Sequence, residues 1–360
     1  MVSHFIDIIV LTWNQKEVTK KFISSFFAST HVPCRLIIID NGSTDGTQEF
    51  LSILAGNDSV KVTVVLNSEN KGFVEGMNQG IRLSEAPFVC LANNDLEFTR
   101  GWLEEIISVF EANPRIGIVN PNSNNLGERP QDKEPTGVFA DKLRREFKGV
   151  FVEMPFCIGF CMVIRRQVIE AVGGLSPEFS PFFFEDTDYS LKALRAGFLV
   201  GMAKGAYVWH QEHASVNGLG EQKEAYFSAS RKVFLKKWGR ILRIMFVVKS
   251  AQEIDGILPG AIALARSGNF VWIAARGVTI AASEIFRQRN LTEHSGVKLV
   301  PFSSVVSLGW KILVKKKRYD VLITTDPFIR TVAVSRGAKV LNAFDAKTIE
   351  KIKFQGRQSA

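Results

Sequence analysis

Asparagine and aspartate side chains end an apolar stretch of the chain near residue 90. Phe88 to Ala92 are apolar and predict a short buried strand, and Asn93-Asn94-Asp95 follow directly. In open α/β sheets, ligands bind outside the carboxyl ends of the strands. Oxygen ligands at such a place suit Mg²⁺ or Mn²⁺, which in turn clamps a phosphate. An ordinary polar turn is the alternative that these residues alone leave open.

A second carboxylate ends another predicted strand. Arg35 to Ile39 are followed by Asp40, which can accept a hydrogen bond from the imino N–H of uracil or thymine, or from a ribose hydroxyl. No Gly-x-Gly-x-x-Gly sequence follows the first apolar strand, so a dinucleotide fingerprint is excluded. Asp40 and Asp95 together predict a nucleotide-diphosphate site without a Walker loop.

Three more carboxylates lie within four residues of one another, in Glu185-Asp186-Thr187-Asp188, directly after the aromatic run that ends at Phe184. Capping of a helix at 189–195 is one explanation, because carboxylates stabilise helix N-termini. A functional role is the other, because three carboxylates within four residues are unusual for plain surface.

Two single residues add to these clusters. Gly159, inside the apolar stretch 156–164, leaves room for a close approach to the backbone. His210 follows a further apolar stretch, and an imidazole there can serve as a nitrogen ligand. A packed or hydrogen-bonded histidine is the alternative.

The elements that must position these residues form an alternating pattern in the first half of the chain. Strands are predicted at 6–11, 35–39, 60–66, 88–92, 116–119 and 156–164, and helices at 16–29, from 47 onward, within 70–80, and at 101–109, 167–172 and 189–195. This alternation predicts βαβ units and a parallel sheet. Residues 121–150 show no periodicity, which leaves a binding loop and a disordered insertion both open.

A second α/β unit is predicted after residue 240. A basic amphipathic helix at 225–238 precedes it, as a connector or a membrane-surface helix. The predicted strands are 244–248, 270–274, 297–301, 319–324 and 339–343, and the predicted helices are 257–266, 277–289, 304–317 and 328–335. We therefore expect domains at 1–240 and 241–360.

The composition fits such a chain. Its 360 residues suffice for two cores, and 46% of them are hydrophobic. No uninterrupted apolar stretch is long enough to span a bilayer, and the N-terminus reads as a first strand rather than a secretion signal. The four cysteines do not suggest a disulfide framework, so a reducing cytoplasm is expected. Cys157 and Cys161 are expected to be buried apolar residues.

The charge is distributed unevenly along the chain. Residues 1–230 contain 21 Lys and Arg against 28 Asp and Glu, whereas residues 231–360 contain 24 against 8. The basic C-terminal part predicts an anionic partner, namely a membrane surface, a phosphorylated lipid carrier or an acidic polymer. A solvated basic surface is the alternative. No nucleic-acid module accompanies the charge, so no nucleic-acid partner is expected.

Four motifs follow one another over about 90 residues. They are Ile9-Val-Leu-Thr-Trp-Asn14, Asp40-Asn-Gly-Ser-Thr-Asp-Gly-Thr47, Asn70-Lys-Gly-Phe73 with Asn78 and Gly80, and Leu91-Ala-Asn-Asn-Asp95. With them, residues 5 to about 235 resemble a family 2 glycosyltransferase with the GT-A fold, and the third motif is similar to that of bacterial rhamnosyltransferase-like members. The family's D-x-D appears as Asn93-Asn94-Asp95, so only Asp95 offers charge to a metal.

The resemblance implies a role for each group of residues. It implies nucleotide-sugar contacts for Thr12, Asn14, Asp40, Asn41, Ser43, Asn70, Gly72, Asn78, Asn94 and Asp95. It implies Mn²⁺ or Mg²⁺ on Asp95 and His210, with His213 the less favoured histidine and Ser215 a candidate for phosphate. The general base would be Asp186, supported by Glu185, and the acceptor would contact Asp188 and Gly159.

We therefore expect an inverting, metal-dependent enzyme that moves a sugar from a UDP- or dTDP-linked donor to a hydroxyl of a growing bacterial surface glycan, free or lipid-linked. It would act in the cytoplasm, with a peripheral contact to the inner face of the cell membrane. Residues 241–360, a Rossmann-like accessory domain, resemble in topology the N-terminal half of a GT-B glycosyltransferase or glycerophosphotransferase.

Two alternatives stand beside this expectation. In a non-catalytic glycan-assembly scaffold, Asn93-Asn94-Asp95 would mark lost activity. A nucleotidyltransferase would need a Gly-rich, basic first loop, which residues 12–15 do not supply.

Overall fold

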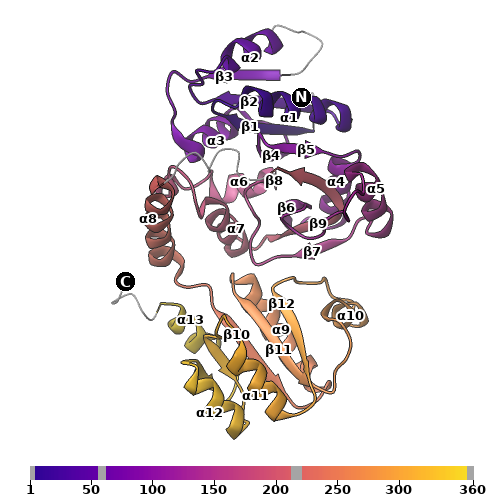
Figure 1. Cartoon of the computed structure of the whole chain (residues 1–360), viewed down its shortest axis with the longest axis vertical. Coiled ribbons are helices and arrows are strands. Elements are labelled where there is room, and N and C mark those ends of the chain that lie inside the picture. Colours follow the sequence, from indigo (N-terminus) through magenta and orange to yellow (C-terminus); the bar gives the residue numbers. More distant parts are fainter. Residues whose placement is uncertain (1–4, 56–61, 212–220, 355–360) are drawn as a thin grey trace. The chain divides into compact units, whose positions relative to one another are not determined.

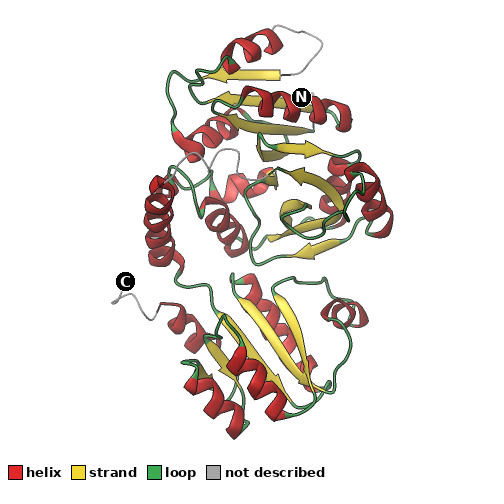
Figure 2. Cartoon of the chain, in the orientation of Figure 1, coloured by secondary structure: helices red, strands yellow, loops and turns green. Residues whose placement is uncertain are grey.

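The computed structural model describes residues 5–55, 62–211 and 221–354. The chain divides into two compact units, one formed by Met1–Phe151 and Phe156–Val233 and the other by Val152–Pro155 and Phe234–Ala360. Figure 1 labels the elements of each unit, and Figure 2 separates helices from strands by colour. Each unit is a sheet flanked by helices.

The larger sheet has nine strands among the described residues, in the order β3-β2-β1-β4-β8-β6-β9-β5, with β7 pairing with β9. The strands are β1 (Ile6–Thr12), β2 (Cys34–Asp40), β3 (Val62–Leu66), β4 (Phe88–Asn93), β5 (Leu96–Phe98), β6 (Ile116–Asn122), β7 (Phe151–Glu153), β8 (Cys161–Arg165) and β9 (Leu199–His210). The parallel pairing predicted for the first half is confirmed for β1 to β4. Strand β8 departs from it, because it runs antiparallel to both β4 and β6.

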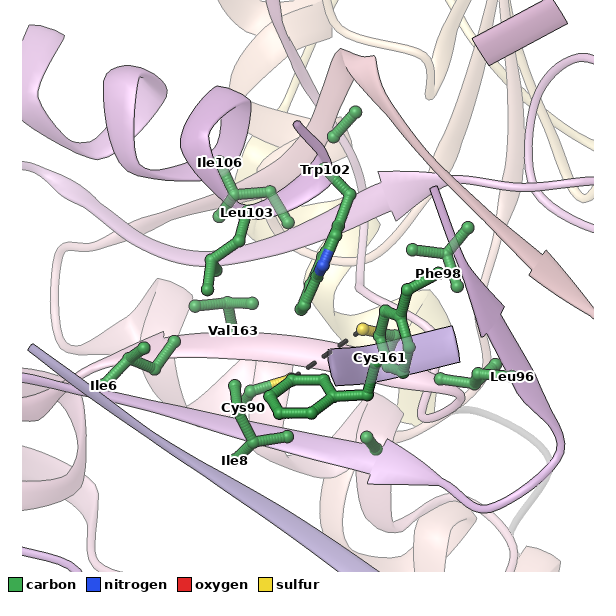
Figure 3. Packing of buried hydrophobic residues seen from close by; sticks show 14 of the residues in the cluster. Ile6, Ile8, Cys90, Leu96, Phe98, Trp102, Leu103, Ile106, Cys161 and Val163 are labelled. Carbon is green, nitrogen blue, oxygen red and sulfur yellow. Dashed lines mark hydrogen bonds between the residues drawn. The ribbon is translucent and has the colours of Figure 1, made fainter. Parts of the chain in front are cut away.

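Helices cover both faces of this sheet. The helices of this part of the chain are α1 (Lys16–Ser29), α2 (Thr47–Ala55), α3 (Gly72–Leu83), α4 (Trp102–Ala112), α5 (Thr136–Glu146), α6 (Arg166–Val172), α7 (Glu185–Arg195) and α8 (Glu221–Trp238), with a 3-10 turn η1 (Pro177–Phe179). Alternate residues of a strand face opposite sides. Ile8 therefore packs with α1 and α4, whereas Ile9 packs with α3, α6 and α7. Figure 3 shows part of the first cluster, with Trp102 and Phe98 near Cys90 and Cys161.

The glycines of the third motif let α3 lie directly on β1. A Cβ on Gly76 would come within 2.4 Å of Leu11 Cδ1, and a Cβ on Gly80 within 2.3 Å of Ile9 Cγ2. The two glycines are one helical turn apart, so they present a single flat strip to the strand. This part of the motif therefore serves packing.

Two predictions for the first unit are wrong. Residues 121–150 contain α5, which buries Phe139 and Leu143 against Tyr207. Its inward face is too short to produce a clear helical period in the sequence. The strand predicted at 156–164 begins only at Cys161, because the side chain of Asn120 bonds to the backbone on both sides of Gly159 and holds residues 156–160 as a loop.

The second unit contains a five-stranded parallel sheet within the described residues, in the order β12-β11-β10-β13-β14. Its strands are β10 (Arg243–Val248), β11 (Phe270–Arg276), β12 (Val297–Phe302), β13 (Val321–Ile323) and β14 (Lys339–Leu341), and its helices are α9 (Glu253–Arg266), α10 (Ala282–Gln288), α11 (Val305–Val314), α12 (Pro327–Ser335) and α13 (Ala346–Phe354). Helices α11 and α12 pack on one face, and α9, α10 and α13 on the other. The sequence predicted these elements except α13.

The cysteines are free thiols, and Cys90, Cys157 and Cys161 are buried, as expected. Burial raises the pKa of the Cys157 thiol, so it is an inert core residue. Among the helices that the structure describes, none combines the length and apolar character that crossing a bilayer requires.

Candidate active site

The carboxyl ends of three neighbouring strands bring the first and last motifs together. Strand β1 lies between β2 and β4, and the register places Thr12 opposite Asp40 and Leu11 opposite Asn93. Asn94 follows at once, and its side-chain amide lies 3.2 Å from Thr19 Oγ1, which in turn lies 2.7 Å from Thr12 Oγ1. The predicted Thr12, Asp40 and Asn94 therefore share one edge of the sheet.

Asp40 is fully buried, and its two carboxylate oxygens differ. Oδ1 accepts hydrogen bonds from the backbone of Gly42 and Ser43 and from the side chain of Gln48. Oδ2 is buried without a hydrogen-bond partner among the described residues. A buried, unpaired carboxylate oxygen is costly, so this atom is suited to accept from a ligand N–H or O–H.

Most amides of the predicted nucleotide site bind the chain's own loops. The backbone N–H of Asn14 donates to Ser43 Oγ, 2.7 Å away, and the Asn14 side chain accepts from the backbone N–H of Thr44. Asn41 donates to Asn70 Oδ1 at 2.9 Å and accepts from the backbone of Lys71. These bonds hold the loops after β1, β2 and β3 against one another.

Gly72 and Asn70 form the turn that starts α3. Gly72 has a φ of 80°, in the left-handed region that favours glycine, and its N–H donates to Asn70 Oδ1. Pro181 packs against it, 3.3 Å from the position that a Cβ would take. The motif thus joins α3 to the segment that precedes the acidic cluster.

Asp95 and His210 face each other across β5 and β9. His210 Nε2 lies 3.2 Å from Asp95 Oδ1, and both side chains are largely buried. The carboxylate oxygen nevertheless makes no aligned hydrogen bond within the described residues. The β5–β9 register, which pairs Leu96 with His210, produces this approach.

Two asparagines that the sequence analysis did not identify hold His210 in place. Asn124 exchanges two hydrogen bonds with the His210 backbone, each 2.8 Å long. Asn125 Nδ2 lies 2.6 Å from His210 Nδ1, which orients the ring with Nε2 toward Asp95. The ring of Phe160 stacks on the imidazole with centroids 5.3 Å apart. The run of asparagines at 120–125 was the available signal.

Asp186 begins α7 beside Glu185. Its Oδ2 accepts from the Gly159 N–H at 2.9 Å, and its Oδ1 accepts from the backbone and hydroxyl of Thr187. Burial raises the pKa of Asp186, whereas the bonds from Gly159 and Thr187 lower it. Burial raises the pKa of Glu185 to about 8, and the charge of Asp186 adds to this shift. Glu185 therefore holds a proton at neutral pH, whereas the hydrogen bonds from Gly159 and Thr187 favour the charged form of Asp186.

Two predicted site residues are engaged in holding the fold. Asp188 is fully buried and accepts from Ser176 Oγ at 2.6 Å. Asn78 donates to the carbonyl of Leu175 and accepts from the N–H of Leu175, each at 2.9 Å. Both atoms of its amide group are therefore used in fixing the turn before η1.

A continuous series of contacts joins the groups described above. Phe160 stacks on His210, and the Phe160 carbonyl accepts from the N–H of Asn93. Asn93 lies two residues before Asp95 in the sequence. The adjoining Gly159 donates to Asp186. From Asn94 the series continues through Thr12 to Asp40. The series runs through backbone groups and strand register as well as side chains, and of the described Asp40, Asp95, Asp186 and His210 only Asp95 and His210 approach each other directly.

The Asp95–His210 pair fits a divalent cation in part. Neighbouring ligands of an octahedral cation lie about 3 Å apart, which the 3.2 Å separation matches. Carboxylate oxygen and imidazole nitrogen are acceptable to Mn²⁺. No third His, Cys, Asp or Glu of the described residues joins them, so a donor diphosphate would have to complete the coordination. The candidates His213 and Ser215 lie outside the described residues.

The order of the strands can be compared with that of solved structures. The chain is similar to a solved structure, the mannosyltransferase PcManGT from Pyrobaculum calidifontis in complex with GDP-Man and Mn²⁺. The match covers 94% of this chain and 85% of the solved chain, with 16% identity and a TM-score of 0.50. That likeness shows the fold alone. The first unit has the GT-A glycosyltransferase fold, and a second sheet domain follows.

The family follows from the sequence match. Residues 7–173 match the family described as Glycosyl transferase family 2. This match lies almost entirely within the first unit and supports a family 2 glycosyltransferase domain there. The rhamnosyltransferase-like branch and the GT-B likeness of residues 241–360 remain predictions.

Relatives with the same domain are distant in sequence. The uncharacterized protein y4gI of Sinorhizobium fredii is 26% identical over 233 residues, which are 58% of this chain and 25% of the relative. The low-salt glycan biosynthesis hexosyltransferase Agl10 of Haloferax volcanii is 22% identical over 256 residues, 66% of this chain and 78% of the relative. The chain spans between 25% and 62% of the length of three curated relatives it matches, the Sinorhizobium protein among them.

Proposed function

We propose that the first unit transfers a sugar, with inversion, from a UDP- or dTDP-linked donor to a hydroxyl of a growing bacterial surface glycan such as an O-antigen, a capsule or a cell-wall polymer. The observation that carries the proposal is the series of contacts that joins Asp95 and His210, through Phe160 and Gly159, to Asp186. It links a group suited to a diphosphate to a group suited to an acceptor hydroxyl.

The donor side is supported by Asp40 and Asp95. The unpartnered Oδ2 of Asp40 is suited to the imino N–H of uracil or thymine. The oxygen of Asp95 and the nitrogen of His210 would hold Mn²⁺ or Mg²⁺. When bound, such a cation supplies charge that offsets the charge developing on the leaving diphosphate.

The acceptor side is supported by Asp186. A carboxylate offers about four acceptor positions, and the described contacts occupy three of those on Asp186. Oδ2, which accepts the bond from Gly159, is the oxygen that we assign to an acceptor hydroxyl. The proton of this hydroxyl would move to Asp186 while the hydroxyl oxygen forms a bond to the anomeric carbon of the donor. At the same time the bond between that carbon and the diphosphate would break, and its electron pair would leave with the diphosphate. Attack from the opposite face gives inversion.

A donor screen tests the proposal. Release of nucleoside diphosphate is measured with UDP-, dTDP- and GDP-sugars, and calorimetry of UDP, dTDP and GDP is repeated with and without Mn²⁺. We expect UDP or dTDP to bind, more tightly with the cation. Preference for GDP would disprove the assignment of Asp40 to uracil or thymine, and binding of none would favour the non-catalytic scaffold.

We also propose a place of action. The basic C-terminal part supports a peripheral contact with the inner face of the cell membrane, because that face carries anionic lipids. A cytoplasmic enzyme would meet its nucleotide sugar there.

A further inference from the structure

Helix α11 of the second unit exposes an apolar face. Its inward residues Leu308 and Ile312 are buried in the core. On its outer side, Val306, Trp310 and Val314 are 65%, 66% and 59% exposed. These three residues are spaced four apart, so they form one stripe along the helix, and the half-exposed Leu313 lies at its edge.

Helix α12 extends this face. The two helices pack side by side on the same side of the sheet (Figure 1). The ring of Phe328, 45% exposed, lies against Gly309 of α11, where a Cβ would come within 2.5 Å of it. Val334 is 63% exposed near the other end of α12. We define the apolar face as Val306, Trp310, Leu313, Val314, Phe328 and Val334.

Positive charge borders the apolar face at the end of α11. Lys315-Lys316-Lys317-Arg318 follow the helix directly, and the last three are exposed. Arg336, at the end of α12, donates to the Lys315 carbonyl and so lies at the same end. Neither α11 nor α12 contains an acidic residue. The ammonium of Lys315 itself lies over Trp272 and bonds to Tyr319, so the exposed charge comes from the other three residues of the run.

We propose that this face docks the second unit on an anionic lipid bilayer. Apolar side chains with a tryptophan enter the boundary between headgroups and acyl chains, while lysine and arginine bind anionic headgroups. A second copy of the chain is the less suitable occupant, because it would bring the same positive charge to the interface. The inference concerns a surface outside the proposed transfer site and does not depend on the donor or acceptor.

Vesicle binding by the full chain tests the proposal. Co-sedimentation is measured with phosphatidylcholine vesicles that contain or lack phosphatidylglycerol. We expect binding to the anionic vesicles only, weakened by salt. Lys316→Gln with Lys317→Gln should weaken it by roughly tenfold or more, because each basic residue near such a surface contributes about fivefold. The triple variant Val306→Ser, Trp310→Ser, Val314→Ser should also lose binding.

Matched controls separate docking from general effects. Lys347→Gln with Lys351→Gln removes the same charge from exposed positions of α13, and Ile53→Ser removes a 78% exposed apolar side chain from α2. Both should bind vesicles as the unchanged protein does. Circular dichroism and donor binding should be the same in every variant, which shows that each one folds.

Three outcomes would overturn the proposal. One is equal binding to neutral and anionic vesicles. Another is equal loss in the α13 and α11 charge variants. The third is a dimer in sedimentation velocity that the triple serine variant dissociates while vesicle binding persists, since the apolar face would then join two copies of the chain.

Discussion

At the scale of single residues, the acidic pair at the start of α7 divides its roles by environment. Glu185 Oε2 is buried without a hydrogen-bond partner in the described part of the chain, whereas both oxygens of Asp186 accept from the backbone. Hydrogen bonds stabilise the ionised form and burial the neutral one. The pair therefore supports one neutral acid and one base.

Replacing the proposed base tests this division. Asp186→Asn should lower kcat by roughly 10²- to 10⁴-fold, because the acceptor proton loses its receiver, while donor affinity stays the same. Steady-state kinetics and calorimetry measure the two quantities. Asp255→Asn, at an exposed position of the second unit, is the control. Near-normal transfer by a correctly folded Asp186→Asn protein would show that the assignment is wrong.

Glu185 should make the stability depend on pH. Its pKa of about 8 in the folded protein exceeds its ordinary value of 4.5, so the folded state binds the extra proton between these values. Its contribution to the free energy of unfolding is present below pH 4.5 and is lost as pH rises toward 8, by at most about 1.4 kcal/mol per pH unit. Urea unfolding of Glu185→Gln should show a smaller decline over this range than the unchanged protein. Parallel curves would contradict the shift, and the exposed Glu111→Gln is the control.

At the scale of elements, the loop 156–160 places the two halves of the site. Asn120, near the middle of β6, donates to the carbonyls of Ile158 and Cys161 and accepts from the Ile158 N–H. Gly159 and Phe160, the next residues, contact Asp186 and His210. One asparagine on a rigid strand therefore positions the loop that touches both.

Removing that asparagine should affect stability and catalysis together. Asn120→Ala leaves buried backbone groups without partners, so the free energy of unfolding should fall by about 2–5 kcal/mol. kcat should also fall, because the loop no longer holds Asp186. Denaturant unfolding and steady-state kinetics measure both. Asn113→Ala, which removes a single bond to the Arg115 N–H, should change neither strongly. Loss of stability with full kcat would show that Asn120 supports the fold alone.

At the scale of the whole molecule, the two units should respond to pH in opposite directions. In the second unit, His294 accepts from the Gly296 N–H at Nδ1, and its Nε2 is buried without a partner among the described residues. Burial lowers the pKa of His294 to about 3, and the charge of Arg266 adds to the effect. Arg266 is itself paired with Glu153 at 2.7 Å.

Acid should therefore weaken the second unit through His294. Below pH 6.5 the His294 side chain binds a proton in the unfolded chain, but in the folded chain it does so only near pH 3. The free energy of unfolding therefore falls as pH falls through this range, by at most about 1.4 kcal/mol per pH unit. Calorimetry of His294→Gln, which keeps an acceptor for Gly296, should show less acid sensitivity. His31→Gln, at an exposed position of the first unit, should match the unchanged protein. Equal acid sensitivity in both variants would contradict the shift.

The sequence by itself determined the elements and the chemistry of their ends. Apolar runs such as Ile6–Thr12 and Phe88–Asn93, each ended by polar residues, predict strands because the pattern is local. The acidic cluster at α7 and the carboxylates after β2 and β4 were predicted for the same reason. Helix α5 was missed because its inward face has few apolar residues, and only the packing of Tyr207 against them shows that this face is buried.

Only the tertiary structure decided which predicted residues are free for a ligand. Asn78 and Asp188 belong to the predicted site by motif. Yet Asn78 binds Leu175 and Asp188 binds Ser176, and neither partner lies in a predicted motif. The approach of His210 to Asp95 depends on the antiparallel register of β5 and β9, and the identity of Asn125 as its holder depends on a contact 85 residues away. Such contacts join distant parts of the chain, so no local pattern of residue types encodes them.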